Sequence, residues 1–277
     1  MKTRTIGLIA GTGMGEVLSE SGLPCHSNIL RENPFGSPVV YSVFKYRAFQ
    51  LIMLDRHHNT GEPLPPGRLN REAYMYALWK LRVGGILGIS AVGTPYKKDG
   101  LRQGDLVVIG DAIDYVQDYY TFEREGFADL SAFYRPTNNL FCPHLRHALE
   151  NGDHLSDNRF VLANSIKRPG YETPAEMKVR VRDGVDVVGM PTAFPEALLA
   201  GELSIPYGLL CGVSNVAPAK HNGQAVGDAM KAMVPEMMNR ILQALDWLAD
   251  NEHPTDCPCR EGRKESVFDM LGVPSFE

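Results

Sequence analysis

The chain lacks any hydrophobic run long enough to cross a membrane, since none approaches the roughly 18 consecutive apolar residues that a spanning helix needs. The apolar run near the start, in MKTRTIGLIAG, is too short for a secretory leader and is interrupted by glycine. Both absences argue against a membrane partner and against export. We therefore expect a cytoplasmic location.

An excess of positive charge is also missing. The 28 lysines and arginines are outnumbered by 33 aspartates and glutamates, which leaves a formal net charge of -5. Proteins that bind nucleic acid do so through strongly basic surfaces. The composition therefore argues against a nucleic-acid partner.

Cysteine is scarce, and the few cysteines are scattered, which suits a reducing compartment better than a disulfide framework. The five are Cys25, Cys142, Cys211, Cys257 and Cys259. The last two form a C-x-C pair, which we expect to be two free thiols of the tail; a strained disulfide or redox pair is the alternative. No spacing typical of metal ligands is recognised, and we expect neither a metal nor an organic cofactor.

The residues that are present indicate one large α/β domain. Hydrophobic residues make up 44% of the 277 residues and charged residues 22%, as in ordinary globular proteins. Apolar runs predict buried strands at 5–10, 38–44, 49–55, 84–90, 105–113, 159–164, 186–190 and 207–213. Apolar spacings of three and four predict helices at 69–81, 173–184, 195–203 and 226–251. Pro235 should kink or break the last helix.

Strands that alternate with helices predict an α/β fold: a single domain with a central mixed, mostly parallel twisted sheet flanked by helices. We expect this domain to occupy 1–250. The remainder, 251–277, has a different composition and is interpreted as an irregular C-terminal extension.

Two segments at predicted strand ends have the chemistry of an anion site. The turn AGTGMG follows the first strand, and its glycines let backbone N–H groups approach an anion while Thr12 adds a hydroxyl. A structural tight turn explains the glycines equally well. Arg56 and His57 follow the strand FQLIMLD and can hold a dianion, although a charged loop start is the alternative. The small residues Ser90 and Ala91 would let a ligand lie against the backbone, or would simply pack tightly.

Three later segments offer groups that could hold a heterocycle. Tyr171 presents a stacking face and Glu172 a carboxylate, which could instead cap the following helix. Met190 and Thr192 stand where the strand DVVGM ends, and the carboxyl ends of strands are where α/β folds bind ligands. Asn215 has an amide that can bind a ring nitrogen and a carbonyl, or can form a turn. Glu196 is interpreted as a possible site residue or as a plain first-turn acid of the following helix.

These segments, in this order, resemble the trimeric purine nucleoside phosphorylase family, which includes methylthioadenosine and methylthioinosine phosphorylases. The resemblance runs from residue 5 to about residue 248. It is carried by GLIAGTGMG, LDRHH with PPGRLNREAYMYAL, ISAVGT with LRQGDLVVIGDAIDY, YETPAEM, VVGMPTAFPEALLA and VSNVAPA. The family transfers the pentosyl group of a purine nucleoside to orthophosphate, which gives free base and sugar 1-phosphate.

The resemblance implies a role for each candidate residue. It assigns phosphate binding to Thr12, Arg56, His57, Ser90, Ala91 and Thr192. It places Met190 under the sugar and Tyr171 against the base or sugar, and it makes Glu172 and Asn215 the residues that read the base. Orthophosphate is then a co-substrate, and a homotrimer or a dimer of trimers is implied.

Residue 215 bears on the choice of base. In the family, Asp at this place accompanies 6-aminopurines and Asn accompanies 6-oxopurines, because an ionised Asp cannot donate to O6 whereas Asn can. Glu172 can accept the N1–H of an oxopurine. We therefore expect a preference for inosine, guanosine or 5′-methylthioinosine. The alternatives are a 5′-methylthioadenosine phosphorylase and a non-catalytic purine-binding protein.

The chain departs from the family pattern around the sugar and the phosphate. GMPTAFPE replaces a GMSTVPE-type run and places Pro191 before Thr192, which bears on the role of Thr192. KRPGYET, with Arg168, replaces a GPRFET-type run, and His58 stands where glycine is common. His58 and His221 are interpreted either as contacts to the 5′ substituent or as solvent-facing residues.

Overall fold

A computed structural model describes residues 4–11, 23–36, 38–57, 64–95, 100–124, 130–150, 160–166, 170–190, 192–217, 223–261 and 265–270. Its strands are β1 (Arg4–Ala10), β2 (Cys25–Leu30), β3 (Val39–Tyr46), β4 (Phe49–Asp55), β5 (Ile86–Pro95), β6 (Leu106–Asp114), β7 (Phe160–Asn164), β8 (Val187–Gly189) and β9 (Tyr207–Ala217). Its α-helices are α2 (Arg71–Lys80), α3 (Pro143–Leu149), α4 (Pro174–Arg182), α5 (Ala193–Glu202), α6 (Gly223–Asp250) and α7 (Val267–Met270).

The strands form one mixed sheet in the order β2-β3-β4-β1-β5-β8-β7-β6-β9, and β5 also pairs with β9. That extra pairing closes β5, β8, β7, β6 and β9 into a ring, while β2, β3, β4 and β1 extend from it as an open sheet. The pairs β4–β1, β1–β5 and β5–β9 are parallel, as are β6–β7 and β7–β8. The pairs β2–β3, β3–β4, β5–β8 and β6–β9 are antiparallel. The predicted mixed α/β fold is confirmed.

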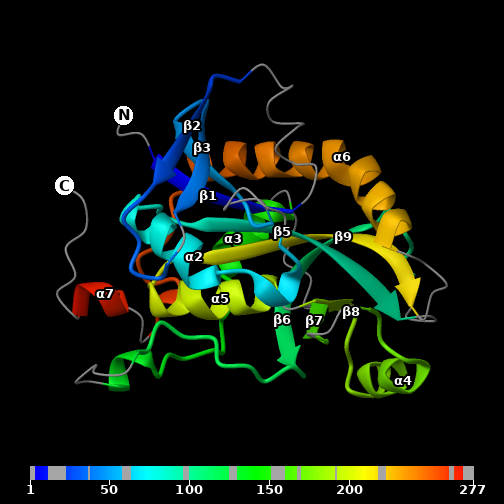
Figure 1. Cartoon of the computed structure of the whole chain (residues 1–277). Helices are drawn as coiled ribbons and strands as arrows, with labels where there is room; N and C mark the ends of the chain where they lie inside the picture. The colour runs from blue at the N-terminus through cyan, green and yellow to red at the C-terminus, as the bar shows by residue number, and fades with distance from the viewer. Residues whose placement is uncertain are drawn as a thin grey trace.

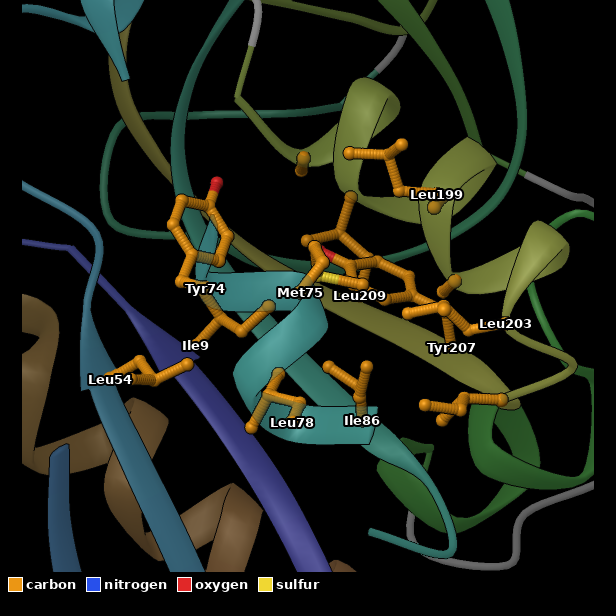
Figure 2. Packing of buried hydrophobic residues seen from close by; sticks show 14 of the residues in the cluster. Ile9, Leu54, Tyr74, Met75, Leu78, Ile86, Leu199, Leu203, Tyr207 and Leu209 are labelled. Carbon is orange, nitrogen blue, oxygen red and sulfur yellow. The ribbon is translucent and has the colours of Figure 1, made fainter. Parts of the chain in front are cut away.

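Helices cover both faces of the sheet (Figure 1). α2 and α5 share one hydrophobic core with β5 and β9, in which Tyr74, Leu78, Leu199 and Leu209 are buried (Figure 2). α3 and α6 share a second core with β1 and β4 on the opposite face. A sheet covered on both faces accounts for the nearly continuous apolar runs of β1 and β5.

The long C-terminal helix was predicted with a kink or break at Pro235. α6 is one helix of 28 residues with Pro235 inside it. Figure 1 shows it changing direction in its N-terminal half, the half that contains Pro235. A proline removes one backbone hydrogen bond and crowds the preceding turn, so the helix bends here without ending.

Three of the described strands and α-helices were not predicted from the sequence: β2, α3 and α7, a four-residue helix in the segment expected to be irregular. β2 is an edge strand with five of its six residues exposed, so the sequence CHSNIL has no apolar run to reveal it. α3 follows Cys142 and is only seven residues long. The apolar run of β9 ends at Val213, and the strand was expected to end at Ser214 and Asn215, but it continues to Ala217.

The tail beyond α6 packs against the body of the molecule. Cys257 and Cys259 are buried in the second core, and Val267 and Phe268 in the first. The Phe268 ring lies 4.8 Å from the Trp79 ring, centroid to centroid. Among the described residues, no helix combines the length and the apolar character that crossing a bilayer requires.

Candidate active site

A cavity of about 820 Å³ lies at the carboxyl ends of β4, β8 and β9, beside the middle of β5. The candidate residues that line it are Arg56, His57, Ser90, Ala91, Tyr171, Glu172, Met190, Thr192 and Asn215. The structure thus brings together nine residues that are up to 159 positions apart in the sequence. Thr12, His58, Arg168, Pro191 and His221 lie outside the described residues.

Arg56 lies beneath the cavity and is held by an internal ion pair. It follows β4, is 2% exposed, and donates from Nε and Nη2 to the two carboxylate oxygens of Glu196 at 2.8 and 3.0 Å. Nη1 donates to the Ile89 carbonyl at 2.6 Å. Burial alone would lower the pKa of Arg56, but the Glu196 carboxylate raises it above its usual value. The guanidinium is therefore a fixed positive charge whose Nε–Nη2 edge faces Glu196, while the residue also lines the cavity.

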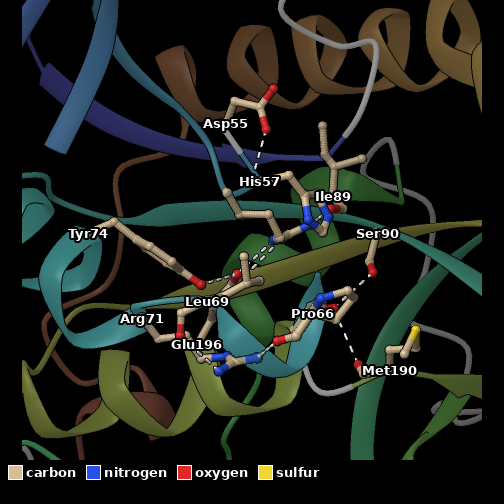
Figure 3. Close-up of polar contacts among 12 residues, drawn as sticks. Asp55, His57, Pro66, Leu69, Arg71, Tyr74, Ile89, Ser90, Met190 and Glu196 are labelled. Atoms are coloured by element: carbon tan, nitrogen blue, oxygen red, sulfur yellow. Dashed lines mark hydrogen bonds and ion pairs between the residues drawn. The ribbon is translucent and has the colours of Figure 1, made fainter. Parts of the chain in front are cut away.

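Glu196 is the residue whose importance the sequence left open. Its side chain is fully buried and also accepts a hydrogen bond from the Tyr74 hydroxyl at 2.8 Å (Figure 3). The Tyr207 hydroxyl donates to the other carboxylate oxygen, also at 2.8 Å. Burial, with the Glu196 charge, raises the pKa of both tyrosines well above the usual value, so both stay neutral donors. Glu196 is an anchor for Arg56 rather than a plain first-turn acid, and the sequence signal for it was only its position at a helix start.

Gly88 makes room for this group. A Cβ built on Gly88 would lie 2.1 Å from the Tyr207 hydroxyl and 2.7 Å from its Cζ. Real side-chain atoms do not approach so closely, so any larger residue would displace the hydroxyl from Glu196. The glycine of the strand ILGIS therefore has a packing role that is tied to the charged group.

His57 uses one ring nitrogen within the protein. Its Nδ1 lies 2.9 Å from the Leu64 carbonyl, so Nδ1 carries the hydrogen and Nε2 remains for the cavity. Burial lowers the pKa of His57, and the Arg56 charge acts in the same direction. At neutral pH the imidazole is then neutral and Nε2 is an acceptor. It could accept a hydrogen bond from a protonated phosphate oxygen, but it could not donate one to a fully deprotonated oxygen.

Ser90 and Thr192 bring two hydroxyls to one wall of the cavity. Their oxygens are 3.4 Å apart, although 102 residues separate them in the chain. Thr192 is the N-cap residue of α5, and its hydroxyl makes no capping hydrogen bond to the first turn of that helix. Hydroxyls at a helix N-terminus, with Arg56 behind them, form an environment that suits an anion.

Asn215 is brought to the cavity by an irregularity of β9. The register between β5 and β9 shifts at Val92 and Gly93, so that Ser214 is an extra residue and Asn215 faces Gly93. Ser214 Oγ lies 2.9 Å from Asn215 Oδ1 and 3.1 Å from the Val92 carbonyl, and we assign its single hydrogen to the nearer acceptor, Asn215 Oδ1. This hydrogen bond orients the amide and leaves the two Nδ2 hydrogens for a ligand. Asn215 lies inside a strand and does not form a turn.

Glu172 is left available because other residues cap the helix that follows it. Thr173 accepts the Glu176 N–H, and Glu176 accepts the Thr173 N–H, which completes a capping box at the start of α4. The alternative capping role of Glu172 is therefore wrong, and its half-buried side chain lines the cavity. Tyr171 beside it is 40% exposed and lines the same cavity.

An apolar wall of the cavity was not predicted from the sequence. Val226, Met230 and Val234 lie four residues apart on one face of α6 and line the cavity opposite the strand ends. The same spacing is typical of any helix face that packs on a core, so the sequence could not assign these residues to a site.

The fold and the cavity together define an α/β protein whose cavity is lined by a buried guanidinium, two hydroxyls, an amide and a carboxylate. The phosphorylase superfamily model matches residues 5–248, and the chain belongs to that family. A probable 6-oxopurine nucleoside phosphorylase of Dictyoglomus turgidum is 34% identical over 267 residues, covering 94% of this chain and 97% of that protein. A probable S-methyl-5′-thioinosine phosphorylase of Methanothermobacter thermautotrophicus is 30% identical, covering 92% and 87%.

Solved structures share the same fold. A methylthioadenosine phosphorylase from an antarctic soil metagenomic library superposes with a TM-score of 0.76 at 24% identity, covering 95% of this chain and 91% of that chain. An adenosine/methylthioadenosine phosphorylase variant of Schistosoma mansoni, in complex with adenine, superposes with the same TM-score at 21% identity, covering 90% and 93%. At this identity the likeness concerns the fold alone.

Proposed function

We propose that this protein catalyses the phosphorolysis of purine nucleosides, with a preference for 6-oxopurines, to free base and sugar 1-phosphate. One observation carries the proposal: the Asn215 amide and the Glu172 carboxylate line the same cavity as the Ser90 and Thr192 hydroxyls. We infer that base recognition and anion binding share this cavity. The reaction needs orthophosphate as co-substrate, and we propose that it uses no metal or organic cofactor.

The anion site suits the charge that develops during the reaction. Cleaving the glycosidic bond builds positive charge on the sugar, and an anion beneath C1′ stabilises that charge and then captures the sugar. Ser90 and Thr192 can donate to phosphate oxygens, and Ala91 offers backbone at the same place. Arg56 contributes a buried positive charge, because its pairing with Glu196 keeps it in position. Neutral His57 offers Nε2 to a protonated phosphate oxygen.

The base site suits an oxopurine. In a nucleoside of hypoxanthine or guanine, N7 and O6 are both acceptors and N1 carries a hydrogen. The two Nδ2 hydrogens of Asn215 match the acceptors, because Ser214 already holds Oδ1. Glu172 can accept N1–H. A donor aimed at N7 and O6 also stabilises the negative charge of the departing purine.

The 5′ substituent is a second question, and one observation favours a methylthio group. The wall of Val226, Met230 and Val234 offers only hydrocarbon and thioether surface to a ligand in the cavity. Such a wall stabilises a methylthio group by burying it, whereas a 5′-hydroxyl would lose a hydrogen bond to water there. We propose 5′-methylthioinosine as the preferred nucleoside, with Met190 and Tyr171 packing against the sugar and base.

The proposed assembly rests on the family resemblance, and the proposed location rests on the scattered cysteines and the short N-terminal apolar run. We propose a homotrimer or a dimer of trimers in the cytoplasm. In the resembling family a neighbouring subunit often completes the site, and the half-exposed Tyr171 is a surface that such a neighbour could cover.

A substrate panel tests the proposal. Nucleosides with a 5′-hydroxyl or 5′-methylthio group and adenine, hypoxanthine or guanine are assayed for release of base with and without orthophosphate. We expect phosphate-dependent release, with the highest kcat/KM for methylthioinosine. A higher kcat/KM for methylthioadenosine would contradict the base assignment, and binding without turnover would indicate a purine-binding protein.

The variant Asn215→Asp sharpens this test. A carboxylate at this position accepts but does not donate, so we expect the ratio of kcat/KM for hypoxanthine over adenine nucleosides to fall by about 10- to 100-fold, as when a hydrogen bond is removed. Asn138→Asp, at an exposed position away from the cavity, is the matched control and should leave the ratio unchanged. An unchanged ratio in Asn215→Asp would remove Asn215 from the base site.

A further inference from the structure

Four side chains with metal-binding atoms meet beneath the C-terminal end of α6, away from the cavity. They are Cys142, His253, Cys257 and Cys259, and their ligand atoms all lie within 4.8 Å of one another. Cys142 precedes α3, 111 residues before His253. None of the four lines the active-site cavity.

The distances within this sulfur cluster match a single tetrahedral ion. The Sγ atoms of the three cysteines are 3.2, 3.4 and 3.8 Å apart. His253 Nε2 lies 3.1 Å from Cys142 Sγ and 3.6 Å from Cys259 Sγ. Zinc bound at about 2.3 Å to sulfur and about 2.0 Å to nitrogen holds its ligand atoms about 3.8 Å (S to S) and about 3.6 Å (S to N) apart. The five separations given above run from 3.1 to 3.8 Å, and all the ligand atoms lie within 4.8 Å of one another, so the four groups surround a space of the size that one such ion occupies.

The surroundings orient the ligands as metal sites do. His253 Nδ1 lies 3.0 Å from the Pro254 carbonyl, so Nδ1 carries the hydrogen and Nε2 presents its lone pair to the sulfur atoms. A backbone carbonyl on the second ring nitrogen is the usual partner of a metal-bound histidine. The three thiols are buried, while the imidazole is half-buried and leaves an edge for the ion to enter.

We propose that Cys142, His253, Cys257 and Cys259 bind one Zn²⁺, which fastens the C-terminal tail to the segment before α3. The set of three thiolates and one imidazole is a common closed, structural zinc site. When the ion binds, each cysteine thiol loses its proton to solvent and becomes a zinc-bound thiolate. The step involves no change of oxidation state. The site leaves no position for a substrate, so the ion is structural and the proposal is independent of the proposed function.

Zinc accounts for the cluster more completely than a disulfide does. Any one disulfide among the three cysteines would leave a third buried sulfur and the oriented His253 without a purpose. The five described cysteines are free thiols in this structure. The sequence contained the tail half of the site as H-x3-C-x-C, His253 to Cys259. The expectation of two incidental tail thiols missed it because the fourth ligand is remote.

The test is elemental analysis of the full-length protein after dialysis against metal-free buffer. We expect one zinc per chain. After removal of zinc with a chelator under reducing conditions, Co²⁺ should give the visible bands of a tetrahedral ion with thiolate charge transfer. The midpoint of thermal unfolding should fall by about 5–10 °C without the ion and recover with Zn²⁺.

Variants locate the site, and the wild-type measurements decide the case if a variant does not fold. Cys257→Ser and His253→Ala should each weaken zinc binding by about 100-fold or more, since even a partner of a ligand contributes 10- to 100-fold. Cys25→Ser and His26→Ala, at exposed positions outside the cluster, should bind zinc as the wild type does. Wild-type protein that contains no zinc, another metal in its place, or a disulfide among the three cysteines overturns the proposal. Wild-type protein that contains zinc but releases no base from purine nucleosides would count against the proposed function alone.

Discussion

Two buried polar clusters lie in this molecule, and they solve the same problem in different ways. The charged cluster of Arg56, Glu196, Tyr74 and Tyr207 sits beneath the cavity and contains a cation, an anion and two hydroxyl donors. The sulfur cluster beneath α6 contains four electron-pair donors and no side-chain cation among them. Burial penalises any polar group that lacks a partner.

The difference concerns where the complementary charge comes from. In the charged cluster each oxygen of Glu196 accepts one guanidinium N–H and one tyrosine hydroxyl, so the protein supplies every partner itself. In the sulfur cluster the partner has to come from outside, and Zn²⁺ has the charge and geometry to do so. The first cluster thus fixes a charge next to the site, and the second fixes the tail.

The largest effect should follow from breaking the charged cluster at its anion. Glu196→Gln places an amide N–H₂ against a guanidinium or hydroxyl donor and leaves the Arg56 charge buried without a counterion. We expect a loss of about 3–5 kcal/mol in the free energy of unfolding, measured with urea. Activity should also fall, because Arg56 is no longer held beneath the phosphate site.

Glu236→Gln is the matched control, since Glu236 is exposed on α6. It should change the free energy of unfolding by less than about 0.5 kcal/mol. A Glu196→Gln variant as stable as this control would show that the charged cluster contributes nothing measurable, and the comparison with the sulfur cluster would fail.

The sequence predicted most of the sheet because buried strands are continuous apolar runs. β1, β4, β5 and β9 were recognised in this way, and apolar spacings of three and four predicted α4, although the capping box of Thr173 and Glu176 was not recognised. β2 escaped because its exposed side chains carry no apolar pattern. The bend without a break in α6 also depended on packing, since Met233 and Met237 on either side of Pro235 are buried against the sheet.

The sequence predicted the candidate site residues one by one. It did not predict the ion pair and the hydrogen bonds that join them to other residues. The sequence indicated Arg56, and it could not show that Glu196, 140 residues later, would occupy the guanidinium edge. Nor could it show that Ser214 would be an extra residue in β9 that orients Asn215. Such pairings depend on strand register and on contacts between distant segments, and local patterns in a single sequence do not encode them.

A smaller effect should follow from crowding the charged cluster without changing a charge. Gly88→Ala places a methyl group where the Tyr207 hydroxyl and Cζ lie. Because the ring would have to move away from Glu196, we expect a loss of about 3 kcal/mol, the upper end for overpacking a core. The measurement is urea unfolding.

Gly227→Ala provides the control for this substitution. A Cβ at Gly227 would meet nothing within 4 Å, and alanine is the better helix former. We expect it to be neutral or stabilising by up to about 1 kcal/mol. If Gly88→Ala proved equally harmless, the hydroxyl of Tyr207 could not be a tight partner of Glu196.

The smallest effect sharpens the comparison with a third buried group, Glu202, which forms no salt bridge with the other residues that the structure describes. It accepts the Phe122 N–H at 2.8 Å, and burial raises the pKa of its carboxyl to about 7. Between the unfolded pKa of 4.5 and the folded pKa of about 7, the folded state keeps a proton that the unfolded state has lost, so stability falls as pH rises through this window.

The variant Glu202→Gln has no carboxyl proton to lose. Its free energy of unfolding relative to wild type should therefore increase by about 2 kcal/mol from pH 5 to pH 8. Glu236→Gln, measured by urea unfolding at the same pH values, should show no such trend, and a flat difference for Glu202→Gln would mean that its carboxylate is as well stabilised as that of Glu196.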